Sequence, residues 1–133
     1  MERLEHIGIA VKNLDESNKL FAKLLGREHY KIEEVESEGV RTSFFEIGGV
    51  KIELLEATKA DSPIAKFIEK KGEGLHHLAF AVTDIKESMK EKTAQDFSLL
   101  ATEPKDGADN KQIVFFHPKT TNSVLVELCQ DKK

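Results

Sequence analysis

The sequence predicts an α+β fold of two pseudo-duplicated βαβββ modules whose curled sheets form one cleft. The segment HIGIAV at residues 6–11 returns as HLAFAV at residues 77–82. Each copy leads into a helical pattern and then into strand patterns, and the last strand of each carries a glutamate, Glu53 in the first copy and Glu127 in the second. A repeat of this kind indicates that one small supersecondary unit occurs twice.

The length and composition are those of one compact domain. The chain has 133 residues, of which 39% are hydrophobic, enough to bury one core. We expect a single domain over residues 1–133, built of module one at about 3–56, a linker helix at about 57–73 and module two at about 74–130.

Charge and cysteine content narrow the classes of function. The net charge of −4 comes from 24 acidic and 20 basic side chains mixed along the chain, without the basic block that marks a nucleic-acid surface. No apolar run reaches the roughly 20 residues that span a bilayer, and the start of the chain has no signal-peptide pattern. The single Cys129 suits a reducing compartment and is expected only to pack. We therefore expect a protein that binds neither nucleic acid nor membrane. Its expected compartment is the bacterial cytoplasm or, for a processed eukaryotic chain, the mitochondrial matrix, and the absence of a transit-peptide pattern favours the cytoplasm.

The elements of module one follow from alternation and capping signals. Residues 6–11 alternate as a strand, and Asn13 with Asp15 and Glu16 predicts a helix start, with Gly26 as its stop. The Gly48-Gly49 pair is a hairpin signal. The remaining predicted strands are residues 30–38, 41–47 and 50–55.

The second half repeats this order. Residues 77–82 predict a strand, and a helix with Ile85 and Met89 on its apolar stripe runs toward Gln95. Between the modules, the Asp61-Ser62-Pro63 segment predicts a short helix reaching about Lys71. The last predicted strands are residues 98–102, 112–117 and 123–129.

Strand alternation also assigns side chains to faces. In the first strand, Ile7, Ile9 and Val11 share one face, while His6 shares the other with Gly8 and Ala10. The second copy has the same pattern: His77 is followed at the same parity by Ala79 and Ala81. Glu53 and Glu127 likewise lie opposite the apolar residues of their own strands. Both histidines and both glutamates are therefore predicted to face the cleft.

Two histidines and two glutamates make a plausible set of metal ligands. Taken singly, a histidine at a strand start or a glutamate on a strand is more often structural or solvent-facing. Their correspondence under the repeat favours a joint site at His6, Glu53, His77 and Glu127. Such nitrogen and oxygen donors suit Co, Mn, Ni, Fe or Zn, and a site without sulfur ligands favours Lewis-acid chemistry in a metal-binding cleft.

Other histidines receive different interpretations. His76 adjoins His77 but lies on the opposite strand face, so it is interpreted as a structural or supporting residue. His29 has no counterpart in the repeat and is expected at the surface. His117 precedes Pro118 at a strand end, where it either bounds the cleft or binds a ligand.

These residues resemble the vicinal oxygen chelate superfamily (the glyoxalase/bleomycin resistance fold) and, within it, the methylmalonyl-CoA epimerases. The resemblance covers nearly the whole chain. It is carried by residues 6–11, 39–42 with 51–56, 74–80, 103–105, 116–119 and 124–128. The groups at 103–105, 116–119 and 124–128 are the most specific to the epimerases.

The resemblance implies a metal-dependent isomerase that interconverts the two C2 epimers of methylmalonyl-CoA through a metal-stabilised enediolate. It implies one divalent ion per chain, cobalt first with Mn, Ni and Zn possible, held by His6, His77 and Glu127, with Glu53 at a position where some members carry glutamine. It also implies a homodimer.

Epimerisation needs a base on one face of C2 and an acid on the other, and Glu53 and Glu127 are the expected pair. A family member has a further cleft glutamate two or three residues after the glycine matching Gly39, where this chain has Arg41, Thr42 and Ser43. The role of that glutamate as one of the bases cannot be assigned to any residue here, so Glu53 as the second base is a hypothesis.

Coenzyme A carries phosphates, which predicts lysine or arginine at the cleft mouth. Lys119, Lys111 and Arg41 are the candidates, with His117 as a further substrate-binding residue, but none stands out among 20 basic residues.

Two other functions stay open. A glyoxalase I-type lactoylglutathione lyase uses the same two-histidine, two-acid set. A metal-free small-molecule-binding resistance protein of the same fold would have no need of four metal-ligand residues. A ring-cleaving dioxygenase fits less well, because its site uses two histidines and one glutamate.

Overall fold

The computed structural model describes residues 1–132, which divide into two compact units. The N-terminal unit comprises His6–His76, and the C-terminal unit comprises the chain from His77 onward together with Met1–Glu5. Strands and helices follow the order βαβββ twice along the chain. The predicted α+β class and the duplicated module are confirmed.

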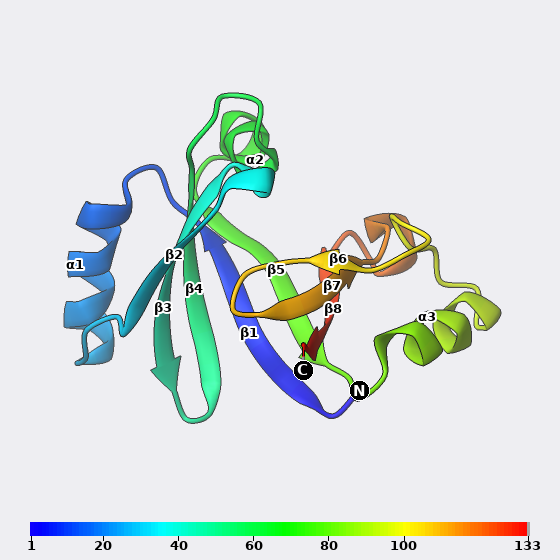
Figure 1. Cartoon of the computed structure of the whole chain (residues 1–133). Coiled ribbons are helices and arrows are strands. Elements are labelled where there is room, and N and C mark those ends of the chain that lie inside the picture. Colours follow the sequence, from blue (N-terminus) through cyan, green and yellow to red (C-terminus); the bar gives the residue numbers. More distant parts are fainter. Residues whose placement is uncertain (133) are drawn as a thin grey trace. The chain divides into compact units, whose positions relative to one another are not determined.

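Four strands, two α-helices and a short 3-10 helix make up the N-terminal unit, and Figure 1 shows their arrangement. The strand order is β2-β3-β4-β1, with β1 parallel to β4 and the other neighbours antiparallel. The elements are β1 (Arg3–Ala10), α1 (Leu14–Leu25), β2 (Lys31–Val35), the 3-10 helix η1 (Glu36–Glu38), β3 (Val40–Ile47), β4 (Val50–Ala57) and α2 (Pro63–Lys71).

Helix α1 forms where the sequence predicts it. The Asn13 side chain accepts a hydrogen bond from the Glu16 amide, and Gly26 ends the helix in the left-handed region at φ 72°. The apolar side of α1 packs on one face of the sheet, in a core that includes Leu14 and Phe45, both fully buried. This helix therefore fixes which sheet face is left for other side chains.

Helix α2, the predicted linker helix, packs on the N-terminal unit. Ser62 caps it by accepting from the Ala65 amide, and Pro63 occupies its first turn. Ile64 packs with Ala10, Val40 and Leu55.

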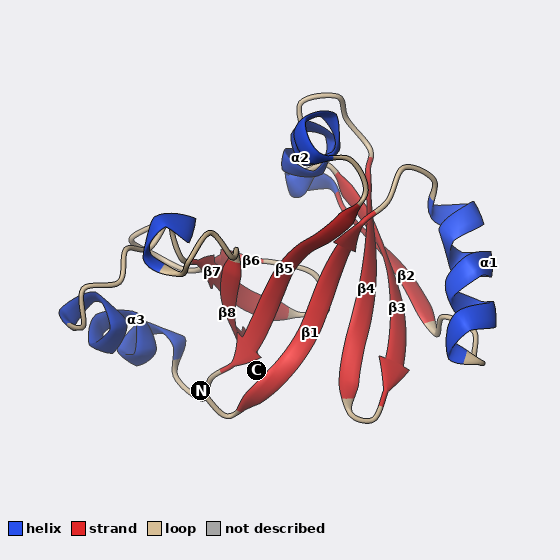
Figure 2. Ribbon diagram, turned by 180° about the vertical axis from the view of Figure 1, so that it is seen from behind, coloured by secondary structure: helices blue, strands red, loops and turns tan. Residues whose placement is uncertain are grey.

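The C-terminal unit repeats the arrangement, with the order β5-β8-β7-β6 and β5 parallel to β8 (Figure 2). Its helix packs on the sheet through a core containing Ile85, Met89, Phe116 and Leu128. The elements are β5 (Gly74–Ala81), α3 (Ile85–Ala94), β6 (Lys105–Asp106), β7 (Lys111–Phe115), the 3-10 helix η2 (Pro118–Thr120) and β8 (Val126–Asp131).

The two modules also cap their helices alike. The Glu56 carboxylate accepts from the first amide of α1, at Leu14, and the Gln130 side chain accepts from the first amide of α3, at Ile85. Glu56 follows Glu53 on β4 as Gln130 follows Glu127 on β8. The same strand that carries each glutamate thus anchors the helix on its other face.

Three predicted strands differ from the structure. The strand predicted at residues 98–102 was wrong: Leu99 makes only an isolated bridge to Phe116, and the short β6 follows later. The strand predicted at 123–129 begins instead at Val126, because Ser123 is in the left-handed region at φ 67°. The strand predicted at 30–38 ends at Val35 and is followed by η1.

No helix among residues 1–132 is long and apolar enough to cross a bilayer.

Candidate functional site

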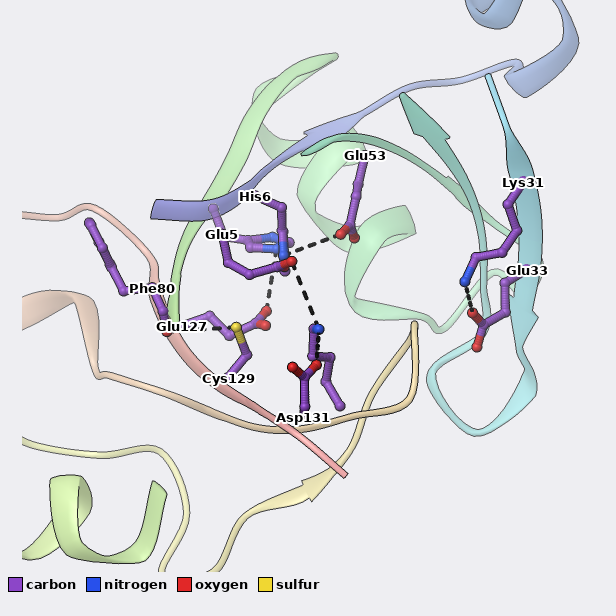
Figure 3. A network of polar contacts seen from close by, with 11 residues as sticks. Glu5, His6, Lys31, Glu33, Glu53, Phe80, Glu127, Cys129 and Asp131 are labelled. Carbon is purple, nitrogen blue, oxygen red and sulfur yellow. Dashed lines mark hydrogen bonds and ion pairs between the residues drawn. The ribbon is translucent and has the colours of Figure 1, made fainter. Parts of the chain in front are cut away.

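The N-terminal unit holds the first histidine–glutamate pair. His6 lies on β1 and Glu53 on β4, and His6 Nδ1 is 3.2 Å from Glu53 Oε2 (Figure 3). Both side chains are only 6% exposed. The parallel pairing of the two strands therefore brings together side chains that are far apart in sequence.

The C-terminal unit holds the equivalent pair. His77 on β5 and Glu127 on β8 approach to 3.3 Å between Nε2 and Oε1, with side chains 6% and 4% exposed. The structure thus brings each predicted histidine to the predicted glutamate of its own module.

Strand register explains why both pairs form. Gly8, two residues past His6, lies directly beside Glu53, and Ala79, two residues past His77, lies directly beside Glu127. The neighbour of each glutamate on this side is small, which leaves room for the carboxylate to turn toward the histidine. The structure supports the expectation that small residues share the face of the histidines.

On its other side, each glutamate has a phenylalanine. Phe44 is directly opposite Glu53 in the β3–β4 pairing, and Phe115 is directly opposite Glu127 in the β7–β8 pairing. The Phe115 ring also meets the ring of His77 edge to face, with centroids 5.6 Å apart and an interplanar angle of 89°. These aromatic neighbours restrict how the carboxylates and the imidazole can turn.

Both glutamates are buried, so each carboxylate needs a compensating cation or hydrogen-bond donor. A carboxylate removed from water is costly unless a cation or hydrogen-bond donors compensate it. Glu53 is 4% and Glu127 3% exposed, each beside an imidazole that can serve as a neutral nitrogen ligand. The donors within each unit, one imidazole and one carboxylate, fit a borderline divalent metal ion.

His76 lies on the other strand face, as predicted. Its ring stacks edge to face on Phe67 of α2, with centroids 4.9 Å apart and an interplanar angle of 79°. Desolvation by burial lowers the pKa of His76 to about 4. His76 is therefore neutral at physiological pH.

Lys111 is buried, although a lysine that binds phosphates at a cleft mouth would be expected at the surface. It is 7% exposed, and its ammonium contacts the Asp131 carboxylate and lies 3.9 Å from Glu5 Oε2. Lys111 shares a sheet face with Glu127, because Lys111 pairs with Asp131 and Phe115 with Glu127 in the same ladder.

His117 and Lys119 lie together at η2. His117 precedes the helix, and its Nδ1 accepts a hydrogen bond from the Lys119 backbone amide at 3.2 Å. Lys119 is exposed and His117 is half-buried. This geometry gives His117 a capping role and leaves the Lys119 side chain accessible.

Arg41 lies on the sheet face opposite Glu53. Its guanidinium is 3.2 Å from Glu56 and 3.7 Å from Asp15, at the start of α1. It is directly opposite Glu56 in the β3–β4 pairing. These contacts give Arg41 a structural role beside the capping carboxylate of α1.

Some residues near the predicted ones were not singled out from the sequence. Lys31 of β2 lies 4.5 Å from the ring centroid of Phe44. Its ammonium is 3.5 Å from Glu33 (Figure 3), and both charged side chains are about one-third exposed. Register places Lys31 on the face of Glu53, a relation that only strand pairing reveals. Cys129 packs as predicted, with its thiol donating to the Phe80 carbonyl.

Comparison with known proteins assigns the family. Residues 5–115 match the model of the Glyoxalase/Bleomycin resistance protein/Dioxygenase superfamily. The chain belongs to this superfamily, as the two modules and their paired residues lead one to expect. Within it, the chain belongs to the methylmalonyl-CoA epimerase family, so its assignment to the isomerases is confirmed at the level of family.

Two relatives match the chain almost from end to end. It is 43% identical over 132 residues to the uncharacterized protein YqjC of Bacillus subtilis, covering 99% of this chain and 94% of that one. It is 39% identical over 132 residues to the ethylmalonyl-CoA/methylmalonyl-CoA epimerase of Cereibacter sphaeroides, covering 96% and 97% respectively.

A solved structure supports the same family. A variant of the Streptomyces coelicolor methylmalonyl-CoA epimerase, in complex with 2-nitronate-propionyl-CoA, aligns with a TM-score of 0.93 at 34% identity. The alignment covers 98% of this chain and 95% of that one.

Proposed function

We propose that this protein interconverts the two C2 epimers of methylmalonyl-CoA. The observation that carries the proposal is the pair of buried histidine–glutamate contacts, repeated at the same strand register in both modules. The family relationship supports it, because the relatives that share almost the full chain include named epimerases of this substrate.

The chemistry needs two proton-transfer groups. The C2 hydrogen of methylmalonyl-CoA lies between a thioester and a carboxylate, so its removal leaves an enediolate. In our proposal, Glu127 as carboxylate takes this proton from one face, and Glu53 as carboxylic acid returns a proton to the opposite face. The roles reverse for the other epimer, and exchange with solvent restores the starting protonation.

We propose that His6, Glu53, His77 and Glu127 bind one divalent metal ion. The support is their burial and their nitrogen and oxygen donors. When bound, the ion would supply Lewis-acid stabilisation of the negative charge that develops on the two oxygens flanking C2. Cobalt is the first ion to test, followed by Mn, Ni and Zn.

The coenzyme A phosphates need a cation that water and ligand can reach. Of the predicted basic residues, Lys119 meets this condition, being exposed at η2 beside His117. We propose Lys119 as the phosphate contact, with His117 holding the turn that presents it.

Hydrogen exchange at C2 tests the proposal. Metal-loaded protein is incubated with methylmalonyl-CoA in deuterium oxide, and deuterium incorporation is followed by NMR beside a chelator-treated control. Metal-dependent exchange with epimer interconversion is expected. Bound metal without exchange would refute the substrate assignment.

Two further assays separate the competing functions. Turnover of methylglyoxal with glutathione would indicate glyoxalase chemistry. A stoichiometric bound metal would count against a metal-free binding protein of the bleomycin-resistance type.

We propose further that the protein is a homodimer, as the family resemblance implies, and that it acts in the cytoplasm, a reducing compartment that suits its single cysteine. Light scattering of the metal-loaded protein gives its mass. A monomer at micromolar concentration would contradict the dimer.

A further inference from the structure

The C-terminal unit contains a buried cation that the proposed proton transfers do not use. Lys111 is 7% exposed, and its side chain contacts two carboxylates of different character. Glu5 is 1% exposed, whereas the Asp131 side chain is 77% exposed. A lysine so placed has one permanent buried counterion and one counterion at the edge of the solvent.

Lys111 lies in line with the residues proposed for catalysis. On one face of the β7–β8 ladder, the successive directly paired residues are Phe115 with Glu127, Ile113 with Cys129, and Lys111 with Asp131. Four residues along a strand span about 13 Å. The row therefore runs from Glu127, the proposed metal ligand, past the Ile113–Cys129 pair to the buried ammonium of Lys111.

Glu5 lies beside the ammonium and near the middle of this row. A carboxylate oxygen of Glu5 and Cys129 Sγ lie within 4.8 Å of one another, and Lys111 Nζ is 3.9 Å from Glu5 Oε2. Cys129 is one same-face step from Glu127 on β8. The Glu5 carboxylate thus lies near both the ammonium and the Cys129 thiol, one same-face step from Glu127.

The middle of the row carries mostly short side chains, packed together in one buried cluster. Ala79, Ala81 and Cys129 provide short side chains there, with Ile113 beside them. The first three leave only a methyl or thiol above the backbone. The apolar neighbours of Lys111 on this face therefore offer no second charged group that competes for its ammonium.

We propose that Lys111 is a specificity-determining residue that binds the free carboxylate of the substrate. This inference rests on the proposed function. The incoming carboxylate takes the place of the exposed Asp131 carboxylate at the ammonium, and Asp131 turns into water. Glu5 stays in place and keeps the ammonium oriented. Lys111 thereby selects malonyl-type thioesters over acyl thioesters that lack the carboxylate.

The exchange of partners is physically favourable for this pair. The exposed Asp131 carboxylate regains water when it leaves the ammonium, and Glu5 stays beside the buried cation, so releasing Asp131 costs less than removing a buried partner would. A charge-assisted hydrogen bond to a substrate carboxylate in a buried setting is stronger than one in water. The substrate therefore gains more from Lys111 than Asp131 loses.

Binding measurements without turnover test the proposal. Malonyl-CoA carries a carboxylate where propionyl-CoA carries a methyl group, and neither has a C2 stereocentre to epimerise. Their dissociation constants are measured by calorimetry on chelator-treated protein, so that no metal contributes to carboxylate recognition. The wild type is expected to prefer malonyl-CoA by about tenfold or more.

Three variants complete the design. Lys111→Met is expected to reduce the preference to within about twofold while leaving propionyl-CoA binding unchanged, whereas Lys111→Arg retains part of it through its charge. Lys90→Met, an exposed lysine on α3, serves as the matched control and keeps the wild-type preference. Circular dichroism verifies folding. If the methionine variant does not fold, the preference of the arginine variant for malonyl-CoA is compared with that of the wild type instead.

The outcomes separate this proposal from the proposed function. Lack of preference in the wild type, an unchanged preference in Lys111→Met, or an equal loss for both thioesters would overturn the carboxylate role. Failure of the wild-type protein to epimerise methylmalonyl-CoA would instead overturn the proposed function, and it is measured in a separate assay with metal present.

Discussion

Ala79 lies directly beside Glu127 in the parallel pairing of β5 with β8, and it is fully buried. Two residues before it on the same face is His77, the partner of Glu127. A larger side chain at position 79 would occupy the space into which the carboxylate turns.

Ala79→Leu should therefore weaken metal binding by about tenfold or more, since supporting contacts of a ligand typically matter on this scale. Overpacking will also cost about 1–3 kcal/mol of folding free energy. Calorimetric titration with cobalt gives the affinity. Phe80→Leu, on the other face of the same strand, is the control and should bind cobalt normally. Equal affinities in the wild type and Ala79→Leu would disprove the spatial argument.

Glu53→Gln tests whether Glu53 is a base as well as a ligand. The amide oxygen can still bind a metal, but the side chain can no longer transfer a proton. We expect cobalt stoichiometry close to one and epimerisation slower by about 10²–10⁴-fold. Deuterium exchange should persist for one epimer, the one whose C2 hydrogen faces Glu127. Normal turnover in this variant would eliminate Glu53 as a base.

Glu127→Gln is the mirror experiment. It should slow epimerisation to a similar extent, and the exchange that remains should belong to the opposite epimer. NMR of each epimer separately distinguishes the two patterns. If both variants lose exchange from both epimers, the proposal that each glutamate serves one face of C2 is wrong.

His76 makes stability depend on pH. Its pKa is lowered by burial from 6.5 to about 4, so the unfolded chain binds the proton more readily than the folded chain. Its contribution to stability is complete above about pH 6.5 and is lost as the pH falls toward 4. The full loss is on the order of 3 kcal/mol for a shift of this size.

Urea unfolding of metal-free protein between pH 4 and pH 7 measures this effect. His76→Phe keeps an aromatic contact with Phe67 and removes the titrating group. Its stability should decline less steeply with acidification than that of the wild type. Parallel curves for the two proteins would show that His76 stays accessible to protons in the folded state.

Phe116 should matter for stability and little for chemistry. It is 2% exposed in the core beneath α3 and contacts the ring of Phe97 at 5.6 Å. Phe116→Ala should cost about 3–5 kcal/mol of unfolding free energy. Activity per folded molecule should stay near the wild-type value, and a thermal melt with an active-site titration checks both. A large loss of activity in the folded variant would link this core to the site.

Much of the site could be predicted because the two-residue alternation of side chains along a strand decides which residues share a face. Alternation along each strand assigns His6 and Glu53 to a common face, and the repeat transfers that assignment to His77 and Glu127. The separation of His76 from His77 follows from the same rule. These are local properties of a strand, which the sequence expresses directly.

Other features depend on pairing between strands, which local patterns do not encode. Lys31 and Phe44 come together only through the β2–β3 register, and Lys111 meets Asp131 only through the β7–β8 register. Glu5 is buried next to a buried His6, contrary to simple alternation. The segment around Leu99 is apolar because it packs against the α3 core, and this apolar pattern led to the wrong prediction of a strand. Leu99 makes only an isolated bridge and no ladder.

Strand β1 serves both compact units: Met1–Glu5 belongs with the chain after His77, and the rest of the strand belongs with residues up to His76. The Glu2 amide donates to the Ala81 carbonyl at 2.9 Å, and the Glu2 carboxylate accepts from Thr83. During synthesis, Met1–Glu5 is made long before the chain from His77 onward, and it must wait for that segment before it finds its partners. A nascent chain halted after module one would contain Met1–Glu5 but not the segment with which it packs.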